Sequence, residues 1–418
     1  MIHQDTGLHE VGRRRSKLLF AVDHIFEVTA EGEVFTVGGK FPYSAWETYL
    51  ESFDEIVVIS RARPARPDAE QILSRSSGPR VRHCLVTAHR GWKRLFAARK
   101  DAVRVGHEVG MADAVIGRIP SELGLSAARM AARQGKPYLL ELVACPWDAL
   151  WNHGSPVSRA YAPILTGRTR AAVKRAPFVR YVTASFLQGR YPTKGKATFA
   201  SNVMLKPIPG NVLEKRSERF EAVNGATGAP LVLGTIGALQ TKLKGVHVAF
   251  QALAEAKSEL PPFIYRVLGE GDPAELQAQA AALGLSGDVQ FDGVLPADEV
   301  ARWLDAVDVY LQPSFQEGLP RGLIEALGRG CLAAGSTAGG IPELLPPERL
   351  HKPGDAHGLA ISLKAIWGVI NGGGALDEVA ASLRTAARYD LGEMKRRRIE
   401  AVADLRTAAE AWRHGKRV

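Results

Sequence analysis

Buried strands and helices alternate throughout the second half of the chain, and this pattern constrains the fold more than any other feature. The apolar runs that are expected to form strands are PLVLGTIG, FIYRVLGE, VQFDG, VDVYLQPS and CLAAGS. Helix-like segments and glycine-bearing turns separate them. Such alternation is typical of a doubly wound parallel sheet. Ligands bind beyond the carboxyl ends of the strands in these sheets, so a functional site is expected in the turns after LGTIG and YLQPS.

The first half of the chain has the same α/β style. Expected strands are KLLFAVDHIFEV, EIVVIS, VRHCLVT, DAVIGRIP, PYLLELVA and RYVTAS, with helices near 43–53, 92–106, 122–134 and 157–176. A chain of 418 residues is too long for one ordinary core, so two domains are expected. A linker around SNVMLKPIPGNVLEKRSER divides them into residues 1–204 and 205–375, and a basic helical tail at 376–418 is expected to pack back across the cleft between them.

Composition narrows the class of protein. With 46% hydrophobic and 23% charged residues, the chain has the make-up of a globular protein rather than a disordered one. The three cysteines, Cys84, Cys145 and Cys331, are odd in number and far apart, which fits a reducing cytoplasm. No apolar run reaches the roughly 18 residues that cross a bilayer, so the sequence predicts a soluble protein or one on a membrane surface.

The formal net charge of +10 indicates an acidic partner. Basic clusters crowd the first half, and the segment RGWKRLFAARKDAVR interleaves Trp92, Leu95 and Phe96 with cations. This pattern favours an anionic membrane surface, with the protein peripheral on the inner, cytoplasmic face. A solvated surface is the alternative, whereas no nucleic acid is expected because no nucleic-acid motif accompanies the charge.

Two glutamates flank a turn in QPSFQEGLPRGLIEALGRGC, residues 312–331. Pro320 suits the first position of a helix, whose free backbone N–H groups at 318–321 favour phosphate. Glu325 lies five residues further on, roughly 7 Å away, where a carboxylate can accept hydrogen bonds from a ribose diol. Glu317 can do the same for a sugar hydroxyl on the other side of the phosphates. A surface salt bridge beside a tight turn is the alternative interpretation.

Two further segments contain candidate phosphate-binding turns. LGTIGALQTKLKG places Lys242 and Lys244 at a strand's carboxyl end, where two cations suit a diphosphate leaving group. GEGDPA, at 269–274, fits a dinucleotide fingerprint with Asp292 about 20 residues on. Asp272 would put an anion where the pyrophosphate must lie, so a plain helix cap is the favoured interpretation there.

Residues 231–345 closely resemble the nucleotide-binding domain of the retaining GT-B glycosyltransferases of family 4, also called group 1 glycosyltransferases. The glutamate pair, the Lys-Gly turn and GGIPE stand in that family's order and approximate spacing. The resemblance implies an α/β GT-B fold with two Rossmann-like doubly wound domains facing a cleft. It also implies a nucleotide sugar as donor substrate, retention at the anomeric carbon and no cofactor. The sequence has no DxD-like motif in a suitable loop, and we expect no metal.

Carried over by position, the resemblance gives each matching residue a role. Glu325 corresponds to the ribose-binding glutamate, Glu317 to the one facing the donor sugar, and Lys244 to a diphosphate ligand. The remaining donor-binding candidates are the backbone of Gly318, Leu319 and Pro320, the turn glycine Gly237, and Lys242. Many family members have arginine where this chain has Ala238, and Lys242 is a candidate to supply that missing charge.

The resemblance is weaker in the first half, which is similar to the family's acceptor domain. GKPYLLELVACPWDALWNHG resembles segments of bacterial cell-surface polysaccharide transferases. Gly38 and Gly39, in TVGGKFPYSAW, match best the glycine-rich loop that approaches the donor phosphate, and a simple turn is the alternative. The polar residue at the reacting centre is not assigned, and its candidates are Glu141, Asp148, His153, Asp23 and His24. Trp147 and Trp151 are candidates to stack on a sugar.

The sequence therefore predicts transfer of a hexose-type sugar from a nucleotide sugar to an acceptor hydroxyl, with a saccharide or lipid-linked acceptor. Two alternatives stay open. One is an epimerase or phosphorylase of the same fold. The other is a non-catalytic sugar-binding subunit, which Ala238 and the unassigned acid or base leave possible.

Overall fold

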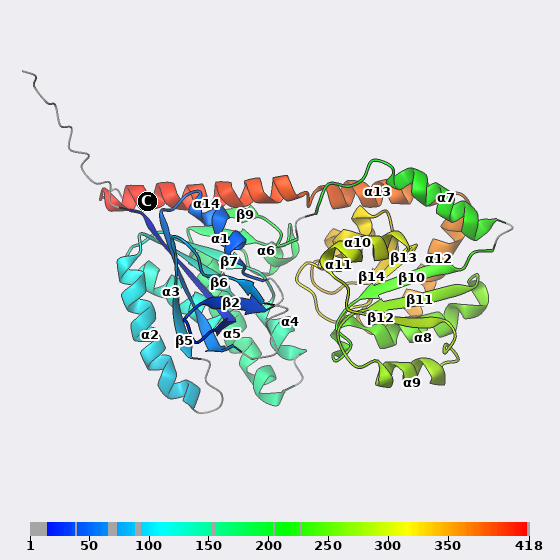
Figure 1. The fold of residues 1–418 in the computed structure, drawn as a ribbon, viewed down its shortest axis with the longest axis horizontal. Helices are drawn as coiled ribbons and strands as arrows, with labels where there is room; N and C mark the ends of the chain where they lie inside the picture. The colour runs from blue at the N-terminus through cyan, green and yellow to red at the C-terminus, as the bar shows by residue number, and fades with distance from the viewer. Residues whose placement is uncertain are drawn as a thin grey trace, which may run out of the picture.

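The structure is a computed structural model that describes residues 15–37, 40–65, 73–87, 93–152, 155–203, 205–225 and 228–415. Two α/β domains lie side by side, and one long C-terminal helix runs back over the first of them (Figure 1). Each domain has its own sheet and its own buried apolar core.

The first domain is built on a mixed sheet whose parallel part runs β5-β3-β1-β6-β7-β8-β9. Strand β2 pairs antiparallel with β1, and β4 pairs antiparallel with β2. The described strands are β1 Lys17–Val28, β2 Val34–Val37, β3 Glu55–Pro64, β4 Leu73–Arg75, β5 Val81–Thr87, β6 Ala114–Ile119, β7 Tyr138–Leu142, β8 Phe178–Tyr181 and β9 Lys196–Phe199. Five consecutive residues of β3 are buried, as expected for a parallel strand covered on both faces.

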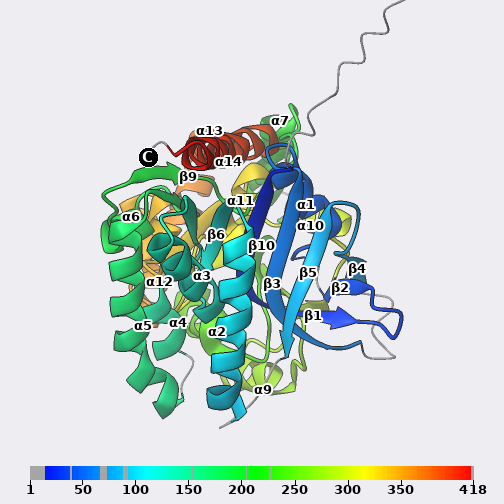
Figure 2. The ribbon, with the colours of Figure 1, turned by 90° about the vertical axis from the view of Figure 1, so that its left-hand side faces the viewer.

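Helices cover both faces of this sheet. They are α1 Tyr43–Leu50, α2 Lys93–Met111, α3 Glu122–Arg133, α4 Pro146–Trp151, α5 Pro156–Arg175 and α6 Phe186–Arg190. Figure 2 shows α2, α3 and α5 together on one face. On the other face, Trp46 and Tyr49 of α1 pack against Phe20 in an aromatic cluster.

The second domain has a fully parallel sheet in the order β12-β11-β10-β13-β14-β15. Its strands are β10 Leu231–Ile236, β11 Phe263–Leu268, β12 Val289–Gly293, β13 Val309–Gln312, β14 Leu332–Ser336 and β15 Leu350–His351. Its helices are α7 Val212–Asn224, α8 Val246–Ala256, α9 Ala274–Ala282, α10 Ala297–Asp305, α11 Arg321–Gly328 and α12 Ala356–Asn371, with short 3₁₀ turns at η2 Lys242–Lys244, η3 Lys257–Glu259, η4 Ile341–Glu343 and η5 Pro347–Arg349.

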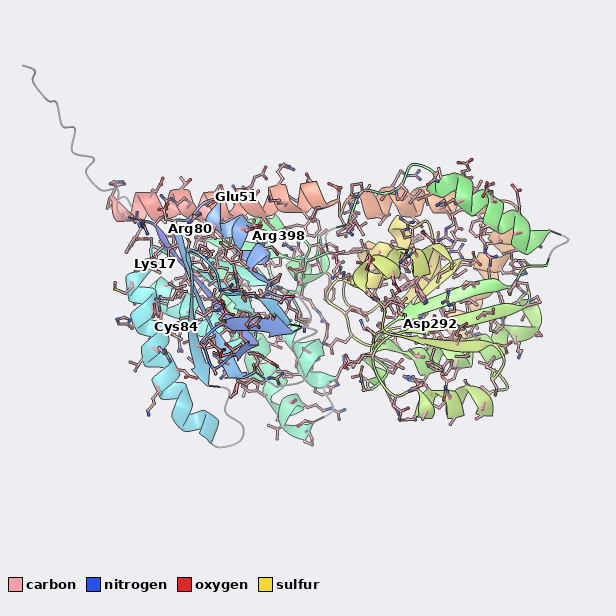
Figure 3. The ribbon with its side chains drawn as sticks, in the orientation of Figure 1. Lys17, Glu51, Arg80, Cys84, Asp292 and Arg398 are labelled. Atoms are coloured by element: carbon pink, nitrogen blue, oxygen red, sulfur yellow. The ribbon has the colours of Figure 1, made fainter. Side chains whose placement is uncertain are left out.

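The C-terminal tail divides between the two domains. Helix α13 (Ala375–Ala387) packs on α7 and α11 of the second domain, and α14 (Leu391–Arg413) then returns to the first domain (Figure 1). Val402 and Leu405 of α14 are fully buried in the core on the α1 face of the first sheet. Arg398, a residue of α14, points its side chain toward the first domain (Figure 3). The tail is thus helical, and its last helix is part of the first domain's packing.

The five strands predicted in the second half and the six in the first half are all present. The strands β2, β4, β9 and β15 were not predicted, nor were the short helices α4 and α6 or the 16-residue helix α12, and α7 occupies part of the expected linker. Helix α11 starts at Arg321, with Pro320 one position before the first helical residue. Within the described residues, no single helix meets the length and apolarity of a membrane span, although α12 and α13 do so as a pair bent by 116°.

Candidate active site

The predicted donor-site charges Lys244 and Glu317 meet where two neighbouring strands, β10 and β13, end. The Glu317 Oε1 atom accepts hydrogen bonds from Lys244 Nζ at 2.7 Å, Ser314 Oγ at 2.7 Å and Gln312 Nε2 at 3.0 Å. The Glu317 side chain is 9% exposed and that of Lys244 is 30% exposed. The pair is therefore half-buried, held in place, and still within reach of a ligand.

Glycines allow the loops of this site to approach one another closely. A Cβ atom on Gly237 would lie 2.5 Å from Lys244 Cγ, so the lysine stem rests against that glycine's backbone. Gly339 has a φ of +59°, and its Cβ would lie 2.1 Å from the carbonyl oxygen of Glu317. Gly340 N–H donates to the carbonyl of Gly318 at 2.8 Å. The segment 339–340, within GGIPE, thus holds the loop that carries Glu317. The side chain of Leu319 packs on it as well.

Glu325 lies on the second turn of α11 and forms an i,i+4 ion pair with Arg321, 2.8 Å from Nε to Oε1. The salt bridge considered as an alternative is therefore present, but Arg321 is exposed and such pairs contribute little, about 0.3–0.5 kcal/mol. Glu317 and Glu325 both act on one buried phenol: burial raises the pKa of Tyr310 well above its ordinary value, and the two carboxylates raise it further. The hydroxyl of this tyrosine, the second residue of β13, accepts from the N–H of Ile236 at 3.2 Å.

Lys242 has a different environment from Lys244. It is exposed and lines a cavity of about 260 Å³ together with His247, Asp272 and residues of α9. The His247 ring stacks on Phe315 at 5.6 Å, so this cavity borders the loop that carries Glu317. A phosphate role for Lys242 stays a prediction.

The dinucleotide interpretation of GEGDPA is wrong, because its acidic groups already have partners. Asp272 lies one position before Pro273, the N-cap residue of α9, and its Oδ1 accepts from the N–H of Ala274, the first helical residue, at 3.0 Å. Asp292, labelled in the second domain in Figure 3, accepts from Arg266 Nε at 2.9 Å and from Trp303 Nε1 at 2.6 Å. The Asp292 carboxylate, the one expected to bind a ribose in this interpretation, is therefore enclosed and already paired.

The catalytic candidate Glu141 is a structural residue, which corrects the prediction. Its carboxylate is 1% exposed and is bonded to Arg118 Nη1 at 2.9 Å, to the hydroxyl of Tyr49 at 2.9 Å, and to Arg180. Burial alone would raise the pKa of Glu141, but Arg180 and Arg118 hold it below its ordinary value. A buried, fully paired carboxylate of this kind neither reaches a substrate nor releases a proton at neutral pH.

Asp148 lies on α4, at the side of the first domain that faces the second domain (Figure 1). It pairs with Arg190 Nη1 at 2.7 Å and is partly exposed. Asn152 Nδ2, just after α4, donates to the carbonyl of Phe315 at 3.4 Å, which brings α4 beside the Glu317 loop. Trp147 and Trp151 stack on each other at 5.1 Å and are exposed. His153, Gly38 and Gly39 lie outside the described residues.

Asp23 and His24, at the bulge in β1, both have structural partners. Asp23 accepts from Arg61 Nε at 2.6 Å and from the N–H of Glu122, the first residue of α3, at 3.0 Å. His24 Nε2 lies 2.8 Å from Thr36 Oγ1. Burial, with help from Lys40 and Arg118, lowers the pKa of His24 to about 4, so this imidazole is neutral at physiological pH.

Sequence reasoning also missed Glu343, which joins the two domains. The carboxylate of Glu343 accepts three backbone N–H groups of the first domain, those of Ala184 at 2.6 Å, Ser185 at 2.9 Å and Phe186 at 2.6 Å. The motif GGIPE marked this segment in the family resemblance. The partners of Glu343 are almost 160 positions away in the sequence, so no local pattern predicts this contact. Among the described residues, no group of three or more His, Cys, Asp or Glu side chains is arranged to hold a metal ion.

Comparison with solved structures shows the class of fold. A glycosyltransferase from Rickettsia africae aligns over 94% of this chain and 99% of its own, with a TM-score of 0.58 and 16% identity. Alr3699/HepE of Anabaena, solved with UDP-glucose, aligns over 93% of this chain and 99% of its own, with a TM-score of 0.58 and 18% identity. The two Rossmann-like domains with a C-terminal helical region are the GT-B fold.

Sequence comparison shows the family of the second domain. Residues 230–368 match the family model described as Glycosyl transferases group 1. Protein CapJ of Staphylococcus aureus is 28% identical over 342 residues, which are 81% of this chain and 83% of CapJ. The 2-deoxystreptamine glucosyltransferase of Streptomyces kanamyceticus is 29% identical over 72% of this chain and 81% of its own. The chain thus contains a group 1 glycosyltransferase domain over residues 230–368.

Proposed function

We propose that this enzyme transfers a hexose-type sugar from a nucleotide sugar to an acceptor hydroxyl, with retention of the anomeric configuration, during assembly of a bacterial polysaccharide or glycolipid. The observation that carries the proposal is the Lys244–Glu317 pair at the ends of β10 and β13, beside the start of α11. Similar chains support the biological setting. WcaL of Escherichia coli, a putative colanic acid biosynthesis glycosyltransferase, is 34% identical over 150 residues. AmsK of Erwinia amylovora, an amylovoran biosynthesis glycosyltransferase, is 35% identical over 157 residues.

In this scheme the second domain binds the donor. Lys244 and the N-terminus of α11 stabilise the charge that develops on the leaving nucleoside diphosphate, without a metal ion. Glu317 accepts a hydrogen bond from a sugar hydroxyl, and Glu325 accepts from the ribose. Asp148, on the face of the first domain beside the Glu317 loop, is the described first-domain candidate for contact with the acceptor.

The donor role is tested with a thermal-shift screen against UDP-, GDP-, ADP- and dTDP-sugars, followed by the variant Glu325→Ala. We expect donor affinity to fall by roughly 10- to 100-fold, since two hydrogen bonds to a carboxylate are lost, with little change in melting temperature. The matched control is Arg321→Ala, which breaks the same exposed ion pair but keeps the carboxylate. If Arg321→Ala weakens donor binding as much as Glu325→Ala, or if neither does, the ribose role is wrong.

We further propose that the enzyme acts on a lipid-linked or saccharide acceptor at the cytoplasmic face of the membrane, held there by α2. The exposed apolar residues Val103 and Met111 on this basic helix support the idea. Reversing the charges of Lys93, Arg94 and Arg99 should release the protein from anionic vesicles in a co-sedimentation assay, because each cation near such a surface contributes about 1 kcal/mol. Reversal of the exposed Arg302 in the second domain is the control, and continued sedimentation of the triple variant would refute the proposal.

A further inference from the structure

Helix α6 of the first domain depends on the second domain for its N-terminal cap. The first N–H groups of a helix have no intrahelical partners, and a side chain of the helix's own segment usually satisfies them. Here the capping residue Ser185 makes no such bond. Only the N–H of Leu187 has a local partner, Thr183 Oγ1 at 3.0 Å. The N–H groups of residues 184–186 all donate to the carboxylate of Glu343, at 2.6 to 2.9 Å.

These are strong contacts by their chemistry. Hydrogen bonds to an ionised carboxylate are shorter than neutral ones and about twice as strong. A negative charge at the start of a helix also interacts favourably with the helix dipole. Glu343 lies at the end of the 3₁₀ turn η4, whose own hydrogen bond from Glu343 N–H to the carbonyl of Gly340, at 3.1 Å, fixes its backbone. A rigid turn therefore presents the carboxylate to the other domain.

The same short segment also holds the donor loop. Gly340 N–H donates to the carbonyl of Gly318, and the positive φ of Gly339 allows its backbone to touch the carbonyl of Glu317. A Cβ atom on Gly340 would lie 3.3 Å from the Thr183 side chain, so this segment also touches the chain just before α6. Residues 339–343 thus contact the loop that carries Glu317 at one end and the start of α6 at the other.

We propose that Glu343 is a positioning residue that ties the donor loop to the first domain and so sets the distance between donor and acceptor. The consequence for transfer rests on the proposed function, whereas the tie itself does not. Since the donor would bind within the second domain, loss of Glu343 should leave donor affinity nearly unchanged. Turnover should fall, by up to about 100-fold, because small errors in the placement of reacting groups are costly.

The test uses the full chain with three variants: Glu343→Ala, Glu343→Gln and the control Glu348→Ala, an exposed glutamate five residues along the same segment. Hydrogen–deuterium exchange is followed in peptides covering residues 183–190 and 315–319. We expect Glu343→Ala to increase exchange in both peptides and to enlarge the particle in small-angle X-ray scattering. Glu343→Gln keeps an acceptor oxygen without the charge and should give a smaller change in the same direction, and Glu348→Ala should give none.

The proposal is overturned if exchange increases only at 183–190, because Glu343 is then a local helix cap. It is also overturned if donor affinity and turnover fall together, measured with the nucleotide sugar that gives the largest thermal shift. If Glu343→Ala does not fold, the Glu343→Gln pattern decides between the same outcomes. Hydrogen–deuterium exchange and scattering do not depend on enzymatic activity. If the chain transfers no sugar but Glu343→Ala increases exchange in both peptides, the proposed function is refuted, whereas the connection of the two domains through Glu343 is supported.

Discussion

Glu141 in the first domain and Glu317 in the second are both acids near the carboxyl end of a parallel strand, paired with basic side chains. Their surroundings differ. Glu141 is the fourth residue of β7, and its side chain lies on the sheet face that α1 covers, where Tyr49 donates to it. Glu317 comes five residues after the end of β13, in a loop, and its partner Lys244 is 30% exposed. A polar residue inside the strand is enclosed by the helices that cover the sheet, whereas one beyond the strand faces the ligand side.

The largest effect that separates the two acids concerns stability. Glu141→Gln removes one charge from a buried ion cluster and leaves Arg118 and Arg180 without their carboxylate. We expect a loss of roughly 3–5 kcal/mol in the free energy of unfolding, measured by urea denaturation, since breaking a buried ion pair leaves an uncompensated charge. Glu317→Gln is the matched change in the second domain. It should cost about 1 kcal/mol, because Gln keeps an acceptor oxygen and Lys244 can be hydrated.

The effects of the two variants on activity should have the reverse order, with the larger loss in Glu317→Gln. Glu317→Gln should lower sugar transfer by roughly 100-fold or more through loss of a charged contact to the donor, while folded Glu141→Gln should keep much of its turnover. Equal losses of stability in the two variants would mean that burial does not distinguish the two acids. A Glu141→Gln enzyme that is stable but inactive would restore Glu141 as a catalytic candidate.

The same contrast explains what could be predicted from the sequence. The strands of the second sheet other than β15 were predictable because strands covered on both faces are continuous apolar runs bounded by glycine turns, as in residues 231–236. The positions of Lys244, Glu317 and Glu325 after β10 and β13 were also predictable, because they follow from order and spacing near those turns, whereas their roles in donor binding stay predictions. The direct bond between Lys244 and Glu317 was not predicted, since it depends on how two loops 73 positions apart meet.

Residues whose role depends on distant partners were not predictable. Glu141 reads as a polar residue at a strand end, and only its partners Tyr49 and Arg180, 92 and 39 positions away, reveal that it is buried. Glu343 is similar, because its three partners belong to the other domain. The short strands β2 and β4 carry too few residues for a periodic signal.

The smallest expected difference between the two domains is in their stability at acidic pH. Among the described residues, the histidines with the largest pKa changes, His24 and His83, are both in the first domain. Burial lowers the pKa of His83 from 6.5 to about 4, and its ring packs against Phe26 at 4.9 Å. Because the folded state disfavours the protonated form, the stabilisation is present above pH 6.5 and is lost as the pH falls toward 4.

Between pH 7 and pH 5, this one histidine should cost about 2 kcal/mol of unfolding free energy in the wild-type chain. His83→Phe cannot titrate, so its urea midpoint should change less over that range than the wild-type midpoint. The control is His357→Gln, which replaces an exposed histidine of the second domain. If the urea midpoint of His83→Phe depends on pH as strongly as that of the wild type, His83 is not the cause of acid sensitivity in the first domain.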